Sequence, residues 1–304
     1  MQVEANKMVG QVLKPLVFEI EKGGDTSPIK YRRDGMVLDE TLEILKTLYG
    51  NELDYVRIEK IVIGIFFTGV KLSDGSGGVA YTPTADMHSA TCCPTMAAER
   101  PAPVLLKGMT VSNALSQARE SALGNVVELV IMNALSSRFI TSDRYHIVYD
   151  TDSIDLIDLK RAGRIGMVGA FIPFLKVFKA IPGIDLTVVE QKKETLKTDE
   201  MRFYAPAEQA KQVLPLCDTV IITGASIANG TIEELLGLTR PGANVLITGP
   251  TASILPDALF ARNASIVSGV EVTDPDLTID LLSEGVGAYH LFNRCVRKIN
   301  ILKN

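Results

Sequence analysis

The alternation of short apolar runs with helix-like segments in the second half of the chain most constrains its fold. From about Gly163 onward, five apolar runs rich in β-branched residues each precede a segment in which apolar residues recur at helical spacing. The runs show little polar–apolar alternation, which is typical of strands covered on both faces. Five strand–helix units in series predict a parallel sheet with right-handed crossovers, in a doubly wound, Rossmann-like α/β domain.

The first half of the chain has a mixed pattern. Residues 38–48 have the spacing of an amphipathic helix, and residues 57–72, rich in Ile, Val and Phe, predict a strand. The segment 74–78 (DGSGG) predicts a turn, from which residues 78–83 would return as the partner strand of a hairpin. These elements predict an antiparallel sheet with helices behind it.

The boundary between the two patterns predicts two domains. A long loop spans about residues 84–107, and a helical stretch then runs to about Ser137. The segment 150–160 is acidic and has the character of a linker. We therefore expect an α+β domain over residues 1–150 and a Rossmann-like domain over residues 151–304.

Composition narrows the classes of function. The formal net charge of −5 argues against a nucleic-acid partner, because neutralising phosphates requires clustered Lys and Arg. The sequence has no apolar run of about 18 residues, so we expect no membrane span. The start, MQVEANKMVG, does not have the pattern of a signal peptide, and 4 cysteines in 304 residues are not a disulfide framework. We expect a protein of the reducing cytoplasm.

Ligands of an open parallel sheet bind outside the carboxyl ends of its strands, so the loops there are the first candidates. The first of these loops runs from Gly169 through Phe171 to Pro173. A dinucleotide fingerprint needs further glycines that let the backbone approach a pyrophosphate. Bulky Phe171 argues against ordinary NAD binding, although a smaller ligand could stack on it. The alternative is a tight strand-to-helix turn, with Pro173 in the first turn of the helix.

Glu190 closes the second predicted strand, about 20 residues after Gly169. In dinucleotide-binding folds an acid at this place binds a ribose diol. Two alternatives stay open: a solvated carboxylate at the end of a strand, and a carboxylate that faces a ligand other than a nucleotide.

The third loop runs from Thr223 to Thr231. Thr231 and Glu234 have the spacing of a capping box, and Asn229-Gly230 tolerates positive φ. Free N–H groups at the start of the next helix could hold an anion or a carboxylate. The alternative gives the same residues a role in the turn and the cap alone.

The fourth loop begins with Gly249 and Pro250 and is rich in hydroxyl groups, so it could add hydrogen-bond donors beside the third loop. Asp274, before Pro275, has the position of a helix N-cap.

A cluster of metal-ligand types lies outside the predicted parallel sheet. Asp86, His88, Cys92 and Cys93 could bind zinc, iron or copper, although their spacing matches no standard zinc module. The alternatives are a single reactive thiolate and a loop with incidental thiols. No phosphate loop, nucleophile elbow or zincin motif occurs in the sequence.

Several of these motifs together resemble the heavy-metal-chelation domain family. The stretches that carry the resemblance are GVAYTP at 78–83, SALGNVVELVIMNALSS at 121–137, MVGAFIPFL at 167–175, VIITGASIANGTIEELL at 220–236, VLITGPTASILPDALF at 245–260 and VSGVEVTDPD at 267–276. The resemblance implies an N-terminal domain similar to the enolase N-terminal domain, a C-terminal Rossmann-like domain, and an active-site cleft between them. It also implies a role in binding heavy metals or in making a metal-chelating compound.

The positions that fall on the family motifs are candidate ligand-binding residues: Tyr81, Thr82, Asn133, Phe171, Pro173, Thr223, Asn229, Gly230, Thr231 and Pro250. Glu190 and Gly249 join them from the strand-tip argument. His88, Cys92 and Cys93 are the candidate metal ligands, and a transition or heavy metal ion is the candidate cofactor.

The hypothesis is a cleft that holds a small polar or anionic ligand, such as a metal chelate. In it the backbone N–H groups near residues 229–231 and the Gly249 loop would fix the anionic end, and Glu190 would orient a hydroxyl or amine. One alternative is an enzyme with a nucleotide-type cofactor, methyltransferase-like or reductase-like. Another is a carrier without turnover. A homodimer is the default oligomeric state.

Overall fold

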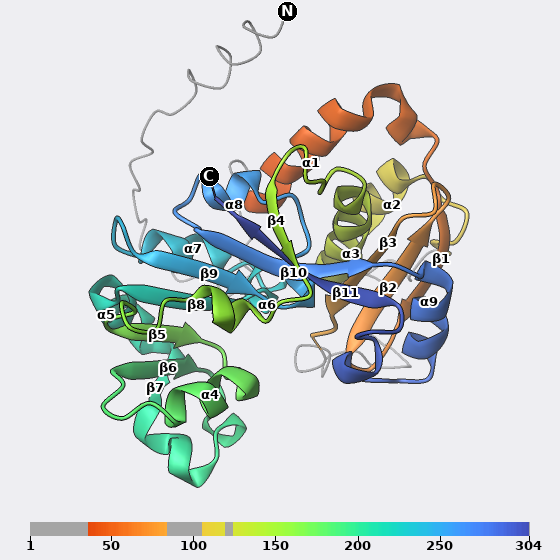
Figure 1. Ribbon diagram of the computed structural model, residues 1–304. Coiled ribbons are helices and arrows are strands. Elements are labelled where there is room, and N and C mark those ends of the chain that lie inside the picture. The colour runs from red at the N-terminus through yellow and green to blue at the C-terminus, as the bar shows by residue number, and fades with distance from the viewer. Residues whose placement is uncertain (1–35, 84–104, 119–123, 304) are drawn as a thin grey trace, which may run out of the picture. The chain divides into compact units, whose positions relative to one another are not determined.

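The computed structural model describes residues 36–83, 105–118 and 124–303. These residues belong to one compact unit, residues 34–304. The unit contains two sheets, one of three strands and one of eight (Figure 1). The mixed α/β class predicted from the sequence is confirmed. The predicted similarity of the two parts to the enolase N-terminal domain and to the Rossmann fold stays a prediction from the sequence.

The small sheet is antiparallel, in the order β1-β2-β3, with β1 at Ile58–Ile63, β2 at Phe67–Leu72 and β3 at Gly77–Tyr81. The predicted hairpin across the DGSGG turn is confirmed by the pairing of β2 with β3. The prediction of one strand over residues 57–72 is wrong. Gly64 lies in a tight connection there and donates its N–H to Phe67 O at 3.1 Å, which divides the apolar run into two paired strands.

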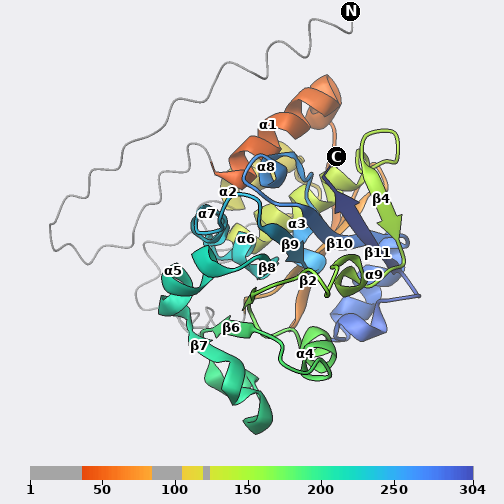
Figure 2. The ribbon, with the colours of Figure 1, turned by 60° about the vertical axis from the view of Figure 1, so that its left-hand side comes forward.

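Three helices accompany the small sheet: α1 at Val37–Tyr49, α2 at Val111–Ala118 and α3 at Gly124–Ser137. The helix predicted over residues 38–48 is confirmed as α1, which buries one apolar face. Helix α3 packs on β3, where Gly78 lets the two backbones approach closely. Helix α9, at Pro275–Ser283, packs against β1 and β2. The helix α9 therefore covers part of a sheet that the first half of the chain supplies (Figures 1 and 2).

The large sheet has the order β4-β11-β10-β9-β8-β5-β6-β7. Its strands are β4 at His146–Tyr149, β5 at Ile165–Val168, β6 at Leu186–Glu190, β7 at Tyr204–Pro206, β8 at Thr219–Thr223, β9 at Asn244–Thr248, β10 at Ile266–Val272 and β11 at Val296–Leu302. The six strands from β5 to β10 are mutually parallel, whereas β11 is antiparallel to both of its neighbours, β10 and β4. The five predicted strands are present, and the parallel set gains β7 as a sixth.

The helices of the second half are short. They are α4 at Ile172–Lys179, α5 at Ala210–Val213, α6 at Ala225–Ala228, α7 at Ile232–Gly237, α8 at Asp257–Phe260 and α9. The 3-10 helices are η2 at Gly50–Asp54, η5 at Ser153–Leu156, η6 at Lys193–Thr195, η7 at Thr198–Phe203, η8 at Ala207–Gln209, η9 at Leu214–Leu216, η10 at Pro250–Ala252 and η11 at Ala288–His290. Asp274 caps α9 as predicted, because its Oδ1 accepts the N–H of Leu277 at 3.0 Å.

The two sequence halves share elements. Strand β4 precedes residue 151 yet pairs with β11 of the large sheet. The carboxylate of Glu233 in α7 accepts the Val37 N–H at the start of α1, at 2.8 Å. One apolar core cluster includes residues of α1, β2 and α3 together with residues of β8 and β9. The contact between the halves is therefore continuous with the core of each.

Candidate functional site

The chain order of the parallel strands reverses at β5. From β5 the chain continues outward through β6 to β7, and then returns to β8, which pairs with the other side of β5. Such a reversal leaves a crevice outside the carboxyl ends of the two central strands, where doubly wound sheets bind their ligands. The tips of β5 and β8 are therefore the candidate site.

Gly169, directly after β5, lets the tip of β5 lie close to the tip of β8. Its φ is +88°, a backbone conformation that favours glycine, and its N–H donates to Val189 O at 3.0 Å. A Cβ atom on Gly169 would lie 3.2 Å from Cβ and Cγ2 of Thr223, at the tip of β8. The first and third loops thus touch through Gly169 and Thr223, as the strand-tip argument expects.

Glu190 ends β6 and reaches the first loop. Its Oε2 accepts the N–H of Ala170 at 3.0 Å, and its Oε1 accepts the N–H of Lys192 at 3.1 Å. The carboxylate is therefore held in a fixed orientation beside Gly169. The structure brings Glu190 to the predicted place, and its action on a ligand stays a prediction.

Phe171 and Pro173 start helix α4. Pro173 lies in the first turn of the helix, as predicted. The half-buried Phe171 ring lies 5.4 Å from the ring of Phe174, centroid to centroid. A glycine fingerprint beginning at Gly169 would place its second and third glycines at residues 171 and 174. Two phenylalanines in contact occupy these positions instead, so the loop lacks the close backbone approach that a pyrophosphate needs.

The NGT segment does not offer the predicted free N–H groups. The N–H groups of Asn229, Gly230 and Thr231 donate to Ala225 O at 3.1 Å, Ile227 O at 3.4 Å and Ser226 O at 2.9 Å, respectively. These three N–H groups are therefore used at the end of α6 and are not free to hold an anion. The predicted anion site at the start of the next helix, α7, stays a prediction.

The predicted capping box at Thr231 is wrong. The Thr231 hydroxyl donates to Asn229 Oδ1 at 2.7 Å and makes no cap bond to α7. The Glu234 side chain points elsewhere and pairs with Lys211 at 3.1 Å. The backbone of Thr231 is in the helical region, with φ −99° and ψ −6°, whereas a residue that caps a helix with its side chain has an extended backbone.

The loop after β9 connects the two sequence halves. Gly249 donates its N–H to Ser268 O at 3.0 Å, and Pro250 begins the short helix η10. Thr251 is the central contact: its Oγ1 accepts the Tyr81 N–H at 3.0 Å, and its O lies 3.4 Å from Asn133 Nδ2. This segment therefore acts as a docking contact. Of the backbone N–H groups in the Gly249 loop that were expected to hold an anion, that of Gly249 is occupied, and the rest of the expectation stays a prediction.

The remaining predicted residues lie around this contact. Asn133 is buried and donates to Val79 O at 2.7 Å, and its Oδ1 has no partner within the described ranges. The Thr82 hydroxyl is buried 3.0 Å from Thr68 Oγ1. Tyr81 is 39% exposed and its ring packs edge-on against Phe67. Of these, only Tyr81 presents a large side-chain surface to solvent.

The predicted residues thus form two neighbouring groups. Phe171, Glu190 and Thr223 lie at the tips of β5, β6 and β8, whereas Tyr81, Asn133 and Pro250 lie around the loop after β9. Gly224 joins the groups, since a Cβ on it would lie 2.9 Å from Ala252 N. Sequence reasoning missed Thr251 as the connecting residue. Its position directly after the tip of β9 is a signal that could have made it a candidate. Its role as a connection could not be predicted, because its partner Tyr81 is distant in sequence.

The candidate metal ligands cannot be placed in the same way. Asp86, His88, Cys92 and Cys93 lie outside the described residues. Within the part of the chain that the structure describes, no three or more His, Cys, Asp and Glu side chains gather as a metal site. Likewise, none of the described helices is long and apolar enough to cross a membrane.

Two family models match the chain. Both carry the description "Putative heavy-metal chelation"; one matches residues 47–136 and the other residues 152–301. The chain belongs to this heavy-metal-chelation family. The match covers β1, β2, β3 and most of α3 in its first part and the tips of the parallel strands in its second part.

Solved structures of other family members share the fold. A protein of unknown function from Pyrococcus horikoshii has a TM-score of 0.69 and 20% sequence identity, over 88% of this chain and 100% of its own. A protein of unknown function from Desulfitobacterium hafniense has a TM-score of 0.58 and 20% identity, over 86% of this chain and 99% of its own. An uncharacterized protein of Methanocaldococcus jannaschii is 24% identical over 117 residues, 37% of this chain. The chain matches only 42% of that relative's length.

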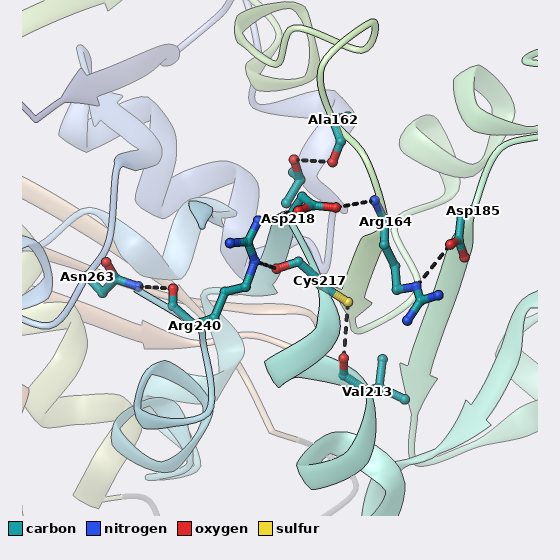
Figure 3. A network of polar contacts seen from close by, with 9 residues as sticks. Ala162, Arg164, Asp185, Val213, Cys217, Asp218, Arg240 and Asn263 are labelled. Atoms are coloured by element: carbon teal, nitrogen blue, oxygen red, sulfur yellow. Dashed lines mark hydrogen bonds and ion pairs between the residues drawn. The ribbon is translucent and has the colours of Figure 1, made fainter. Parts of the chain in front are cut away.

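In this member of the heavy-metal-chelation family a second polar cluster lies at the opposite, amino edge of the parallel sheet (Figure 3). Asp218, just before β8, accepts the Arg164 N–H at 2.8 Å and pairs with Arg240. The Arg164 N–H, followed by the Arg240 guanidinium, lowers the pKa of the Asp218 carboxyl. Arg164 also pairs with Asp185 at 2.9 Å. These contacts join the starts of β5, β6 and β8 away from the candidate site.

The thiol of Cys217, inside this cluster, should make the unfolding free energy of the protein depend on pH. The thiol is buried and donates to Val213 O at 3.2 Å, and burial raises its pKa to about 11 from 9.0. The folded state therefore favours the neutral thiol. The resulting stability is complete below pH 9 and declines as the pH rises from about 9 to about 11. Two pKa units correspond to at most roughly 2–3 kcal/mol.

Urea unfolding of the wild type and of Cys217→Ala, from pH 8 to 11, measures this effect. The variant loses packing at every pH, so the difference in unfolding free energy between the two proteins should be constant below pH 9 and should shrink above it. A difference that stays constant to pH 11 would contradict the prediction.

Proposed function

We propose that this protein binds a small polar ligand at the tips of β5, β6 and β8, and that the ligand is a metal chelate or a compound that chelates a heavy metal. The reversal of chain order between β5 and β8 carries the proposal, because it creates the ligand position of doubly wound sheets. The family description supports the chemical class.

The side chains at this position fit a small ligand. Glu190 supplies a fixed carboxylate that orients a hydroxyl or an amine. The half-buried Phe171 ring supplies an apolar surface for a planar group. Thr223 lies across from them at the tip of β8. A ligand of this kind meets both apolar and hydrogen-bonding surface, which is the usual composition of a small-molecule site.

The heavy metal enters this proposal as cargo. His88, Cys92 and Cys93 supply imidazole and thiolate, the ligand types preferred by zinc, copper and other soft or borderline ions. They remain the candidate residues for direct contact with the metal.

Native mass spectrometry of freshly purified protein tests the proposal. We expect a bound small molecule or metal complex, and the subunit count from the same spectrum tests the expected homodimer. A protein that carries nothing, and that gains no mass or thermal stability with zinc, copper or nickel or with their histidine complexes, would contradict the proposal. A ligand at about a hundred times its Kd adds roughly 2.7 kcal/mol of stability, which a thermal melt detects.

The metal part has its own test. Elemental analysis after metal exposure should show a stoichiometric metal in the wild type and less in Cys92→Ser and Cys93→Ser. Cys217→Ser and Cys295→Ser are the matched controls, because both of these thiols are buried and free in the structure. Substoichiometric metal that neither Cys92→Ser nor Cys93→Ser changes would remove the two cysteines from the proposal.

A further inference from the structure

The Glu190 carboxylate retains unused acceptor capacity. Each of its two oxygens accepts one backbone N–H, from Ala170 at 3.0 Å and from Lys192 at 3.1 Å. A carboxylate offers about four lone-pair sites, so each oxygen can accept one further hydrogen bond. The two backbone bonds also fix the plane of the group before a ligand arrives, which lowers the entropic cost of binding. The result is a rigid pair of adjacent acceptors.

The place of Glu190 in the sheet indicates what such a pair binds. Glu190 ends β6, the strand next to β5, and follows Gly169 by about 20 residues. In doubly wound sheets an acid at this place accepts hydrogen bonds from ribose hydroxyls. Two neighbouring hydroxyls match two adjacent carboxylate acceptors.

The first loop restricts the rest of the ligand. Phe171 and Phe174 stand where a fingerprint has its second and third glycines, and their ring centroids lie 5.4 Å apart. Phe174 is 7% exposed and belongs to the core around α4, so it does not move aside easily. The site thus has an acid at the place where doubly wound sheets bind a diol, and its first loop lacks the backbone surface that binds a pyrophosphate.

We infer that the tips of β5 and β6 bind a ligand with a vicinal diol and without a diphosphate, such as a nucleoside or a riboside, through Glu190. This inference rests on the proposed function, because it names a vicinal diol as the group by which the small polar ligand binds at these strand tips. Glu190 determines the specificity for the diol, and Phe171 excludes dinucleotides.

Isothermal titration of the full-length protein tests the inference with four probes: adenosine, 2′-deoxyadenosine, methyl β-ribofuranoside and NAD. Adenosine should bind, and 2′-deoxyadenosine should bind at least about tenfold more weakly, because it loses one hydrogen bond to a charged acceptor. NAD should bind more weakly than adenosine. Binding of the riboside with the affinity of adenosine would assign the site to the sugar alone, and weaker binding would assign it to a nucleoside.

Glu190→Gln should remove the preference for adenosine over 2′-deoxyadenosine, since the amide presents one acceptor oxygen where the carboxylate presents two. Glu194→Gln is the matched control: it makes the same change at an exposed carboxyl group in η6 and should keep the preference. Thermal melts of both variants report whether they fold.

Equal affinities of the wild type for adenosine and 2′-deoxyadenosine, or no binding of adenosine and the riboside, would overturn the inference. So would NAD binding as tight as adenosine binding. The proposed function fails separately: a small ligand or metal complex found by native mass spectrometry, in a protein that binds no diol, would leave the proposed function standing and remove this inference.

Discussion

Gly78→Ala should be among the most destabilising single substitutions in this chain. A Cβ atom on Gly78 would lie 2.3 Å from Val130 O and 2.6 Å from Ala134 N. Both are backbone atoms of α3, which cannot rotate away as a side chain could. The helix would have to lift from β3, and overpacking of this kind costs roughly 3 kcal/mol or more. Urea unfolding followed by circular dichroism should show this loss, or a protein that no longer folds.

Gly237→Ala is the matched control for Gly78→Ala. Gly237 ends α7, is exposed, and has no atom within 4 Å of the position that a Cβ would take. The same chemical change there should leave stability unchanged or raise it by up to about 1 kcal/mol, through helix propensity. If Gly78→Ala unfolds within about 1 kcal/mol of the wild type, α3 does not pack on β3 as closely as the structure has it.

The parallel sheet could be predicted because its strands carry a local signal. Strands β5, β6, β8, β9 and β10 are apolar runs in the sequence, and burial on both faces of the sheet explains this composition. Strand β7 has three residues and ends in Pro206, which leaves too little pattern to detect. Strand β11 pairs antiparallel with β10 and β4, and its run VRKINIL mixes polar and apolar residues. Its place in the sheet depends on partners distant in sequence.

The candidate site shows the same division between local and distant causes. The positions of Gly169 and Glu190 followed from spacing and strand order, since both are fixed by the sheet itself. The hydrogen bonds of the third and fourth loops did not follow. Thr231 has a capping-box spacing, but its backbone has the helical conformation and not the extended one of a capping residue. The residue Thr251 binds the backbone of Tyr81, a contact that exists only after the two sequence halves have docked.

Asn300→Leu should cost roughly 3 kcal/mol or more of unfolding free energy. Asn300 is 1% exposed in β11. Its Oδ1 accepts the Ser268 hydroxyl at 2.6 Å, and its Nδ2 donates to Val148 O at 3.2 Å and to Thr151 O at 2.9 Å. Leucine is similar in size but leaves three polar groups without their partner: the buried Ser268 hydroxyl and the carbonyls of the half-buried Val148 and Thr151. Urea unfolding at pH 7.5 measures the loss.

A double-mutant cycle with Ser268→Ala separates this network from simple loss of packing. Ser268→Ala alone leaves Asn300 Oδ1 without its donor and should cost about 1–2 kcal/mol. The double variant removes both partners of that bond, so its cost should fall below the sum of the two single costs by about 1 kcal/mol. Strict additivity would show that Ser268 and Asn300 do not interact. In that case the Asn300 side chain would contribute through its bonds to the carbonyls of residues 148 and 151, and not through Ser268.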